Sequence, residues 1–545
     1  MSITQNSLCK KLWLPFAIST MVILALLREI AFFPIPDMIP NPDSSWLIYA
    51  AGRMADGQKP YVDFMETNPP LILWISLLPV LLGKILGLSP FTVFPLLVTL
   101  LNLASMWLVA KVMRGNNLLG AKPVFGAVLL YIAFGFFLLS PAVYGQRELL
   151  FITLVLPYLI KSLFAEREEK STSVDLIIIL MAAIGFALKP FFLLLWGLNE
   201  LHKAIQERNF LSIFALRNWL IGCVQLLYFA AIYYLAPEYI NTIIPAIIST
   251  YFAYETLWYS ILKIIAIICG LALLLAWMAS PHSDFRKIIG RMVVWMFACA
   301  MLMVVQRKDW LNHLYPMVFM AGLVIVMVLL YLVAIWQEIG LLIGRTRFLA
   351  LCVGIATLLA GIYVDGKFWY FIYKHPSVIH TRLLAEIDKH ADGKYVYSLA
   401  FNMQSAFPVI ALSKGVFHGS FYQLWPMSGL IIREQEGKKT EDIVSARKFF
   451  YDNLVHDFSS HPPELVWVDE NVNLEKIADY DIEPENRDII KVLSRDVRFF
   501  VLWQNYEKIG EIEGNKPDND NLEEGEKPMK PERYSLYKRI KKDGV

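Results

Sequence analysis

The sequence predicts an α-helical polytopic membrane protein with a C-terminal soluble α/β domain, and two observations lead to this fold class. Hydrophobic residues make up 57% of the 545 residues, charged residues make up 18%, and the mean hydropathy is +0.49, which is too apolar for a soluble chain of this length. This apolar character ends near residue 369, beyond which Asp, Glu, Lys and His become frequent. We therefore expect a transmembrane domain at 1–368 and a soluble domain at 369–545.

Composition also argues against several kinds of partner and site. The net charge of +2 carries no information about partners in a membrane protein, where the sign of charge matters loop by loop, and nothing suggests nucleic-acid binding. The five cysteines lie in or beside apolar runs, none follows Cys352, and no CxxC or Cys/His spacing is present. We therefore expect no disulfide in the soluble domain and no metal site built from cysteine and histidine.

Eleven apolar runs are long enough, or nearly long enough, to cross a hydrocarbon core of about 30 Å. They lie at 12–33, 93–113, 122–140, 148–165, 174–188, 190–202, 218–236, 257–279, 290–306, 316–336 and 347–368. Lys10 and Lys11 precede the first run, which lacks a small-residue cleavage site, so we expect an uncleaved first helix with its N-terminus inside. The run at 190–202 is short and begins with Pro190, and we retain it as a crossing.

The positive-inside rule decides how residues 71–88 are interpreted. Clusters of Lys and Arg follow alternate runs, and all of them lie on the inner side only if 71–88 does not cross the membrane. Pro79 and the pair Gly83-Lys84 also interrupt this stretch, so we expect an interfacial or re-entrant helix. The first outer loop, with its interfacial helices, then extends over 34–92, and the C-terminal domain lies on the outer side.

The first outer loop carries a polar stretch, PDSSWLIYAAGRMADGQKPYVDFMETNPPL, from Pro42 to Leu71. Asp43 opens a helix signature, where a carboxylate has two compatible roles, as an N-cap or as a group that deprotonates or orients a hydroxyl. Glu66 precedes Asn68-Pro69-Pro70 and is either part of the site or a solvated loop acid. Further site candidates on the expected helix are Tyr49 and Arg53.

Cationic side chains recur in the other expected outer loops. Ionisable groups near a bilayer core are costly, so their default interpretation is functional. The alternatives are an Arg–Glu pair or a snorkelling side chain for Arg147, and an aromatic-belt loop for 306–313. Together such cations would clamp a phosphate whose lipid tail lies between the helices. The phosphate-binding candidates are Arg147, Lys189, Lys308 and His313, with Gln146 and Trp310 as neighbouring candidates.

The C-terminal domain has the mixed pattern of an α/β domain. Apolar or aromatic runs typical of strands lie at 394–401, 464–468, 499–511 and 534–540. Helical patterns lie at 377–390 and 440–458. The charged stretch 514–532 is nearly free of aliphatic residues, and we expect a mobile loop there.

The order of these features resembles a known superfamily. A membrane helix, then an outer loop carrying PDSSW, GQKPYVDF and ETNPPL, then a polytopic body, is similar to the GT-C glycosyltransferases. The likeness is to the branch that contains the protein O-mannosyltransferases and the lipid A aminoarabinose transferase, and it is clearest over 34–114. The later motifs GQRE, LKPF and KDWLNHLYP look similar to those of bacterial relatives in the same superfamily.

The resemblance implies a fold and an activity. Enzymes of this branch pass a sugar from a polyprenyl-phosphate donor to an acceptor on the extracytoplasmic face, with inversion at the anomeric carbon. Carried over to this chain, it makes Asp43 the catalytic acidic group of the first loop and Glu66 the acidic residue ahead of the double proline. It also implies that the helix after the PPL motif lies along the membrane, in agreement with the charge argument.

The expected function is therefore an integral-membrane glycosyltransferase of the inner (plasma) membrane, with its C-terminal domain in the periplasm. Its partners would be a polyprenyl-phosphate-linked sugar donor, membrane lipids, and an envelope acceptor that is a glycan, lipid or protein. No cofactor is strictly required if cations neutralise the leaving phosphate, although the sequence leaves open a divalent ion near Asp43 and Glu66. The alternatives are a lipid-linked sugar transporter or flippase and a non-catalytic scaffold of envelope assembly.

Overall fold

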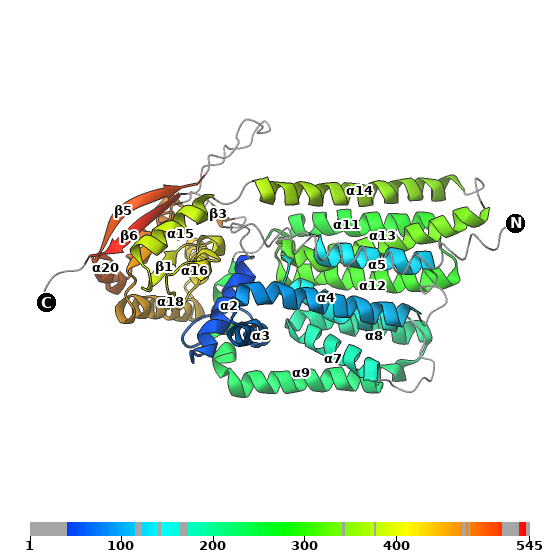
Figure 1. Ribbon diagram of the computed structural model, residues 1–545, viewed down its shortest axis with the longest axis horizontal. Coiled ribbons are helices and arrows are strands. Elements are labelled where there is room, and N and C mark those ends of the chain that lie inside the picture. The colour runs from blue at the N-terminus through cyan, green and yellow to red at the C-terminus, as the bar shows by residue number, and fades with distance from the viewer. Residues whose placement is uncertain are drawn as a thin grey trace. The chain divides into compact units, whose positions relative to one another are not determined.

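The structure is a computed structural model (Figure 1), and it describes residues 41–114, 122–139, 143–163, 173–253, 256–339, 344–374, 378–470, 476–477, 480–514 and 533–540. Within these residues the chain forms two compact units. Unit 1 contains the described parts of Thr92–Ala230 and Leu257–Tyr373. Unit 2 contains the described parts of Pro36–Phe91, Ala231–Thr256 and Lys374–Val545. Two segments from the first part of the chain therefore fold with the C-terminal part.

Unit 1 is built from helices, and in Figure 1 its long helices run in nearly the same direction or its reverse. The elements are α4 (Pro90–Arg114), α5 (Lys122–Phe137), α6 (Arg147–Ser162), α7 (Ser173–Ala187), η2 (Pro190–Phe192), α8 (Leu193–Glu207), η3 (Phe210–Phe214), α9 (Leu216–Leu235), α11 (Trp258–Ala279), α12 (Ser283–Gln306), α13 (Leu311–Ile339) and α14 (Arg345–Lys374). The first two residues of α4, the end of α9 and the last residue of α14 belong to unit 2.

Six helices in the described part of the chain are long and apolar enough to cross a membrane. They are Pro90–Arg114, Leu216–Leu235, Trp258–Ala279, Phe285–Gln306, Leu311–Trp336 and Arg345–Tyr363. The expected crossings at 122–140, 148–165, 174–188 and 190–202 correspond to helices of 15 or 16 residues, which extend only about 24 Å. The expected crossing at 12–33 lies outside the described residues. The chain is a multi-pass membrane protein, and the count of eleven crossings stays a prediction.

Helix α6 lies at the centre of unit 1. Nearly all of its side chains are buried, as expected for a helix that is apolar on every side. Its neighbours include α7, α13 and the 3-10 turn η2, where the rings of Phe151 and Phe192 stack at 3.8 Å. This packing fixes the N-terminus of α6, which carries Arg147 and Glu148, inside the unit.

Unit 2 combines short helices with a mixed sheet. The helices are α2 (Pro42–Ala55), α3 (Leu71–Leu86), η4 (Tyr239–Ile243), α10 (Ile244–Ser249), η5 (Tyr251–Ala253), α15 (Val378–His390), η7 (Met403–Ser405), α16 (Val409–Leu412), α17 (Trp425–Gln435), α18 (Glu441–Ser460), η9 (Pro484–Asn486), α19 (Ile489–Leu493) and α20 (Val497–Trp503). The strands are β1 (Val396–Leu399), β2 (Leu465–Asp469), β3 (Lys476–Ile477), β4 (Tyr480–Asp481), β5 (Tyr506–Glu513) and β6 (Arg533–Arg539).

The main sheet has the order β1-β2-β6-β5, and Figure 1 shows β5 beside β6. Strands β1 and β2 are parallel, with Val396 opposite Leu465, and the other two pairs are antiparallel. Strands β3 and β4 form a separate antiparallel pair. The expected strands at 394–401, 464–468 and 534–540 and the expected helices at 377–390 and 440–458 are thus present. The stretch 515–532, which holds almost all of the expected mobile loop, lies outside the described residues.

The expected strand at 499–511 is wrong in its first half. Residues up to Trp503 form α20, and the strand β5 begins only at Tyr506. Asp496 caps the helix, because its side chain accepts from the Arg498 backbone N–H. Phe499 and Trp503, four residues apart, are buried with their rings 5.8 Å apart. The period of the apolar residues is therefore that of a helix and not that of a strand.

Helix α3 packs on α2 inside unit 2 and is not among the six long apolar helices. Ile72, Ser76 and Val80 are buried, whereas Leu81 and Ile85 are exposed at helical spacing. One side of α3 therefore meets protein and the other presents an apolar stripe. This pattern is the one expected for an interfacial helix, and the position of α3 relative to the bilayer stays a prediction.

Residues 239–253 fold into the short helices η4, α10 and η5, and α10 and η5 pack on α17 and α18. Ser249 Oγ donates to Asp442 Oδ2 at 3.2 Å, and Arg433 Nε donates to the Ser249 carbonyl at 3.4 Å. Gly429 of α17 permits this contact, because a Cβ there would lie 2.0 Å from the Thr250 carbonyl oxygen.

Gly429→Ala should therefore destabilise unit 2. The added Cβ collides with backbone that cannot rotate away, and overpacking of this kind costs about 1–3 kcal/mol or more. Gly52→Ala in α2 is the matched control, because nothing lies within 4 Å of its ideal Cβ and alanine favours the helix by about 1 kcal/mol. Thermal unfolding in detergent checks the pair, and equal melting temperatures for the two variants would contradict the contact.

Candidate active site

Asp43 lies in the first turn of α2 but does not cap the helix. The N-cap is Asn41, whose side-chain oxygen accepts from the Asp43 backbone N–H at 2.9 Å. The interpretation of Asp43 as the N-cap is therefore wrong. The Asp43 side chain is partly exposed, at the end of the helix where the backbone dipole stabilises negative charge. Because Asn41 does the capping, the Asp43 carboxylate is not needed for that purpose.

Glu66 is a buried carboxylate and not a solvated loop acid. Only 1% of the residue is exposed, and Trp46 Nε1 donates to its Oε2 at 2.6 Å. Its Oε1 accepts from the Asn68 backbone N–H at 2.8 Å and from the Asn68 side-chain amide. Both carboxylate oxygens are therefore hydrogen-bonded. Glu66 ties the loop before the double proline to Trp46, the centre of an aromatic cluster on α2.

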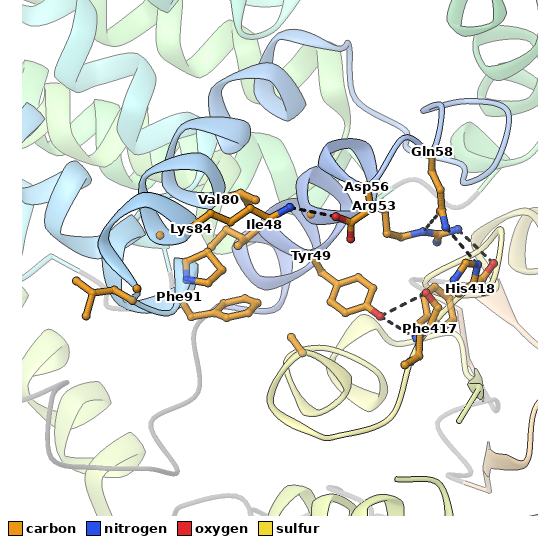
Figure 2. Close-up of a pocket in the computed structure, with 17 residues that line it drawn as sticks. Ile48, Tyr49, Arg53, Asp56, Gln58, Val80, Lys84, Phe91, Phe417 and His418 are labelled. Atoms are coloured by element: carbon orange, nitrogen blue, oxygen red, sulfur yellow. Dashed lines mark hydrogen bonds and ion pairs between the residues drawn. The ribbon is translucent and has the colours of Figure 1, made fainter. Parts of the chain in front are cut away.

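Tyr49 and Arg53 attach α2 to the segment around Phe417 (Figure 2). The Phe417 backbone N–H donates to the Tyr49 hydroxyl at 2.8 Å. Arg53 donates to the Gly419 carbonyl at 2.7 Å, the Asp63 carbonyl at 3.0 Å, the His418 carbonyl at 3.2 Å and the Gln58 side-chain oxygen. Burial lowers the pKa of Arg53 to about 10. Both residues hold the fold of unit 2 together.

Asp457 of α18 anchors the same segment from the other side. Its oxygens accept from the Ser420 backbone N–H and hydroxyl, each at 2.7 Å, and from the Tyr397 hydroxyl at 2.9 Å. The Ser420 carbonyl in turn accepts from the Met65 N–H at 2.8 Å, next to Glu66. Burial raises the pKa of Asp457 to about 6. In the sequence Asp457 looks like any acidic residue on a helix surface, so no local signal indicates this role.

In unit 1, three of the expected phosphate-binding residues surround a carboxylate. Glu148, 1% exposed, forms an ion pair with Lys189, and Lys189 also donates to the Gln306 side-chain oxygen at 3.1 Å. His313 Nε2 lies 3.8 Å from the same Glu148 oxygen. Arg147 adjoins Glu148 in sequence and interacts with it electrostatically. Lys189 has no acidic neighbour along the chain, but the fold supplies one.

The other expected residues of the 306–313 turn extend this cluster. Lys308 is 2% exposed, and its ammonium lies 5.4 Å from the centroid of the Trp310 ring. Trp310 is itself exposed and lies near the His313 ring, at 5.5 Å. Lys308 also interacts electrostatically with His313. Gln146 is buried and is the N-cap residue of α6. The aromatic-belt alternative does not describe this turn, because Lys308 and His313 are buried.

The expected site residues thus form two clusters. Asp43 and Glu66 belong to unit 2, whereas the expected phosphate-binding residues belong to unit 1. Their assembly into a single site stays a prediction. Glu148, Gln306 and Asp457 are the residues that sequence reasoning did not include. Among the described residues, no group of three or more His, Cys, Asp and Glu side chains is placed to hold a metal ion, and the metal requirement stays a prediction.

Comparison with known proteins gives a likeness of fold. No protein-family model matches the chain, and no curated protein matches it by sequence. A crystal structure of ArnT from Cupriavidus metallidurans bound to undecaprenyl phosphate matches at 12% identity with a TM-score of 0.52, covering 86% of this chain and 96% of that chain. The apo form of the same protein matches at 12% identity with a TM-score of 0.51, covering 86% and 94%. The resemblance to the aminoarabinose-transferase branch is confirmed for the fold.

The raised pKa of Asp457 predicts a pH-dependent stability. A buried acid whose folded pKa is about 6, against an ordinary value of 3.8, binds its proton more tightly when folded. Its contribution to stability is therefore complete below about pH 4 and lost as pH rises through about 6, roughly 3 kcal/mol in total. As the pH rises from 4 to 7, Asp457→Asn should therefore lose less stability than the wild type does, and thermal unfolding at each pH measures the difference.

The control for this experiment is Asp452→Asn on the same helix. Ion pairs and hydrogen bonds with Lys448 and Arg498 lower the pKa of Asp452, so its contribution has the opposite sign and is lost as pH falls. If the stability of the wild type and of Asp457→Asn changed with pH in the same way, Asp457 would be ionised in the folded protein at no cost in stability.

The Lys189–Glu148 pair predicts strong coupling in a double-mutant cycle. Lys189→Met leaves a buried carboxylate without its main partner, which costs about 3–5 kcal/mol. Adding Glu148→Gln should restore part of that loss, because the uncompensated charge is removed. Lys161→Met is the control, because its partner Asp175 and Lys161 itself are partly exposed and such pairs contribute about 1 kcal/mol or less. Additive losses in thermal unfolding would contradict the pairing.

Proposed function

We propose that this chain is an integral-membrane glycosyltransferase that moves a sugar from a polyprenyl-phosphate donor to an envelope acceptor on the extracytoplasmic face, with inversion. The observation that carries the proposal is the buried cationic cluster of unit 1. Arg147, Lys189 and Lys308 outnumber the acidic Glu148 and the half-buried Asp309, so the cluster has an excess of positive charge. Buried positive charge in a membrane protein is costly unless an anion offsets it.

The fold supports the choice of anion. One of the two ArnT structures with a similar fold is bound to undecaprenyl phosphate. A lipid phosphate has a charged head that suits the cationic cluster and an apolar tail that suits the surrounding helices. We therefore propose a polyprenyl-phosphate-linked sugar as the donor, with Arg147, Lys189, Lys308 and His313 on its phosphate oxygens. Gln146 and Trp310 would border the same site.

In the proposed reaction Asp43 accepts the proton of the acceptor hydroxyl. The acceptor oxygen bonds to the anomeric carbon from the side opposite the phosphate, so the configuration inverts. The carbon–oxygen bond to the phosphate breaks, and the phosphate leaves with the bonding electron pair. Charge develops on that phosphate in the transition state, and the cationic side chains stabilise it.

Glu66 has a different part in this proposal. Because both of its oxygens accept hydrogen bonds from Trp46 and Asn68, we assign it as a positioning residue that orients α2. Those bonds also make it a poor ligand for a divalent ion, and we propose that no metal is strictly required. The acceptor is a glycan, lipid or protein. We place residues 1–368 in the plasma membrane and 369–545 on its outer side.

Asp43→Asn should lower the rate of sugar transfer by about 100-fold or more, because removal of a general base costs 10²–10⁴-fold. The assay uses the full chain in nanodiscs with radiolabelled undecaprenyl-phosphate sugars and an extract of the native envelope as acceptor. Asp63→Asn is the matched control, since Asp63 is an exposed loop acid whose side chain accepts from the Lys59 N–H.

Transfer at the wild-type rate by Asp43→Asn would remove Asp43 from the mechanism. Movement of the labelled donor across vesicle membranes without any transfer would instead favour a flippase.

A further inference from the structure

A cavity of about 700 Å³ lies within unit 2, and its volume is in the range of small-molecule sites (Figure 2). The second half of α2 forms one wall, the end of α3 with the start of α4 forms another, and the segment 411–418 forms a third. All of these residues belong to unit 2. Neither Asp43 nor Glu66 lines the cavity.

The cavity is separate from the proposed reacting centre on α2. Gly52 lines it and follows Asp43 by nine residues, which is about two and a half turns and about 14 Å along the axis. The two residues therefore lie on opposite sides of the helix. A ligand in the cavity occupies a place distinct from that of the hydroxyl which reacts at Asp43.

The cationic side chains that line the cavity are already engaged by other groups of the protein. Lys84 and Asp56 form an ion pair at 3.0 Å with both side chains well exposed. The Arg53 guanidinium donates to three backbone carbonyls and to Gln58, and Figure 2 shows its bonds to Gln58 and His418. Arg53, Lys84 and Asp56 leave a net charge of +1 on the lining, but both cationic side chains already have partners within the protein. The cavity therefore favours a neutral ligand over a phosphate.

The lining combines aromatic rings with hydrogen-bonding groups. Tyr49, Phe91 and Phe417 supply rings, which suit a ligand with C–H faces. The Gln58 amide lies 3.2 Å from His418 Nδ1, so Nδ1 accepts and Nε2 carries the proton as a donor. The Asp56 carboxylate supplies acceptor lone pairs beyond the one used by Lys84. Planar polar groups beside aromatic rings suit a ligand with many hydroxyls and apolar ring faces.

We propose that this cavity binds a neutral saccharide segment of the acceptor, remote from the hydroxyl that is glycosylated. The proposal rests on the proposed function, because an acceptor is required. Binding of a remote, non-reacting part of a substrate provides free energy that helps to place the reacting group. The acceptor would then be a glycan or a glycosylated lipid or protein, and its neutral sugars would decide whether it is accepted.

Gly52 offers a direct test. Nothing lies within 4 Å of its ideal Cβ, and the residue faces the cavity, so Gly52→Phe fills the space without a backbone clash. Gly52→Ala adds only a methyl group and is the matched control. The full chain in nanodiscs is probed with maltotriose, triacetylchitotriose and the anionic trigalacturonate by saturation-transfer NMR. We expect a neutral trisaccharide to bind, trigalacturonate to bind at least tenfold more weakly, and Gly52→Phe to lose at least tenfold in affinity.

Asp56→Ala provides a second variant in case the phenylalanine disturbs the fold, because this exposed side chain packs little, and we expect a several-fold loss of affinity. The proposal is overturned if neither neutral trisaccharide binds, if Gly52→Phe and Asp56→Ala bind like the wild type, or if trigalacturonate or inorganic phosphate binds better at this cavity. If farnesol binds and only Gly52→Phe prevents its binding, the cavity holds a hydrocarbon chain, and the proposal is also overturned.

The variant Asp43→Asn separates this proposal from the proposed function. We expect it to lower transfer by about 100-fold or more and to keep trisaccharide binding. If Gly52→Phe loses trisaccharide binding but Asp43→Asn transfers sugar normally, only the catalytic role of Asp43 is contradicted. If Gly52→Phe binds the trisaccharide normally but Asp43→Asn loses transfer, only the saccharide site is contradicted.

Discussion

The hydrogen bonds between Asp457 and Ser420 are the interaction on which the described arrangement of α2 depends. They fix the segment that offers its Gly419 carbonyl to Arg53 and its Ser420 carbonyl to the Met65 N–H. The first polar stretch of the chain is thereby held by residues more than 350 positions later. The cost is a buried carboxylate with a raised pKa, offset by three hydrogen bonds.

The need to compensate buried charge also governs unit 1. A carboxylate and several cations are buried together at the N-terminus of α6, and each charge depends on the others for compensation. Such an arrangement is poor evidence for stability, since apolar side chains of similar size would often pack as well. We propose instead that the cluster is kept for an anion, and the proposed donor phosphate is therefore assigned to unit 1 and not to unit 2.

The two units therefore offer different chemistry. Unit 1 has buried positive charge and apolar helices, which suit the phosphate and the tail of a lipid-linked donor. Unit 2 has a cavity whose cationic side chains are already paired or hydrogen-bonded and which offers aromatic rings and hydrogen-bonding groups, and this suits a neutral part of an acceptor. Asp43, at the N-terminal end of α2, is the proposed point where the two substrates react. In this proposal the positions of Tyr49 and Arg53, which hold α2 to the C-terminal part of the chain, matter for acceptor binding as well as for folding.

The sequence by itself determined the membrane class and most helices, because these depend on composition and local pattern, and the motifs of the first outer loop carried the resemblance to the aminoarabinose-transferase branch. The strand prediction fails at α20, where two local signals, an aspartate cap and the four-residue spacing of Phe499 and Trp503, favour a helix. The tertiary structure alone decided that Glu66 is buried, that Asn41 caps α2, and that Lys189 meets Glu148. Glu66 meets Trp46, 20 positions away, and Lys189 meets Glu148, 41 positions away. Folding rather than sequence spacing brings those side chains together.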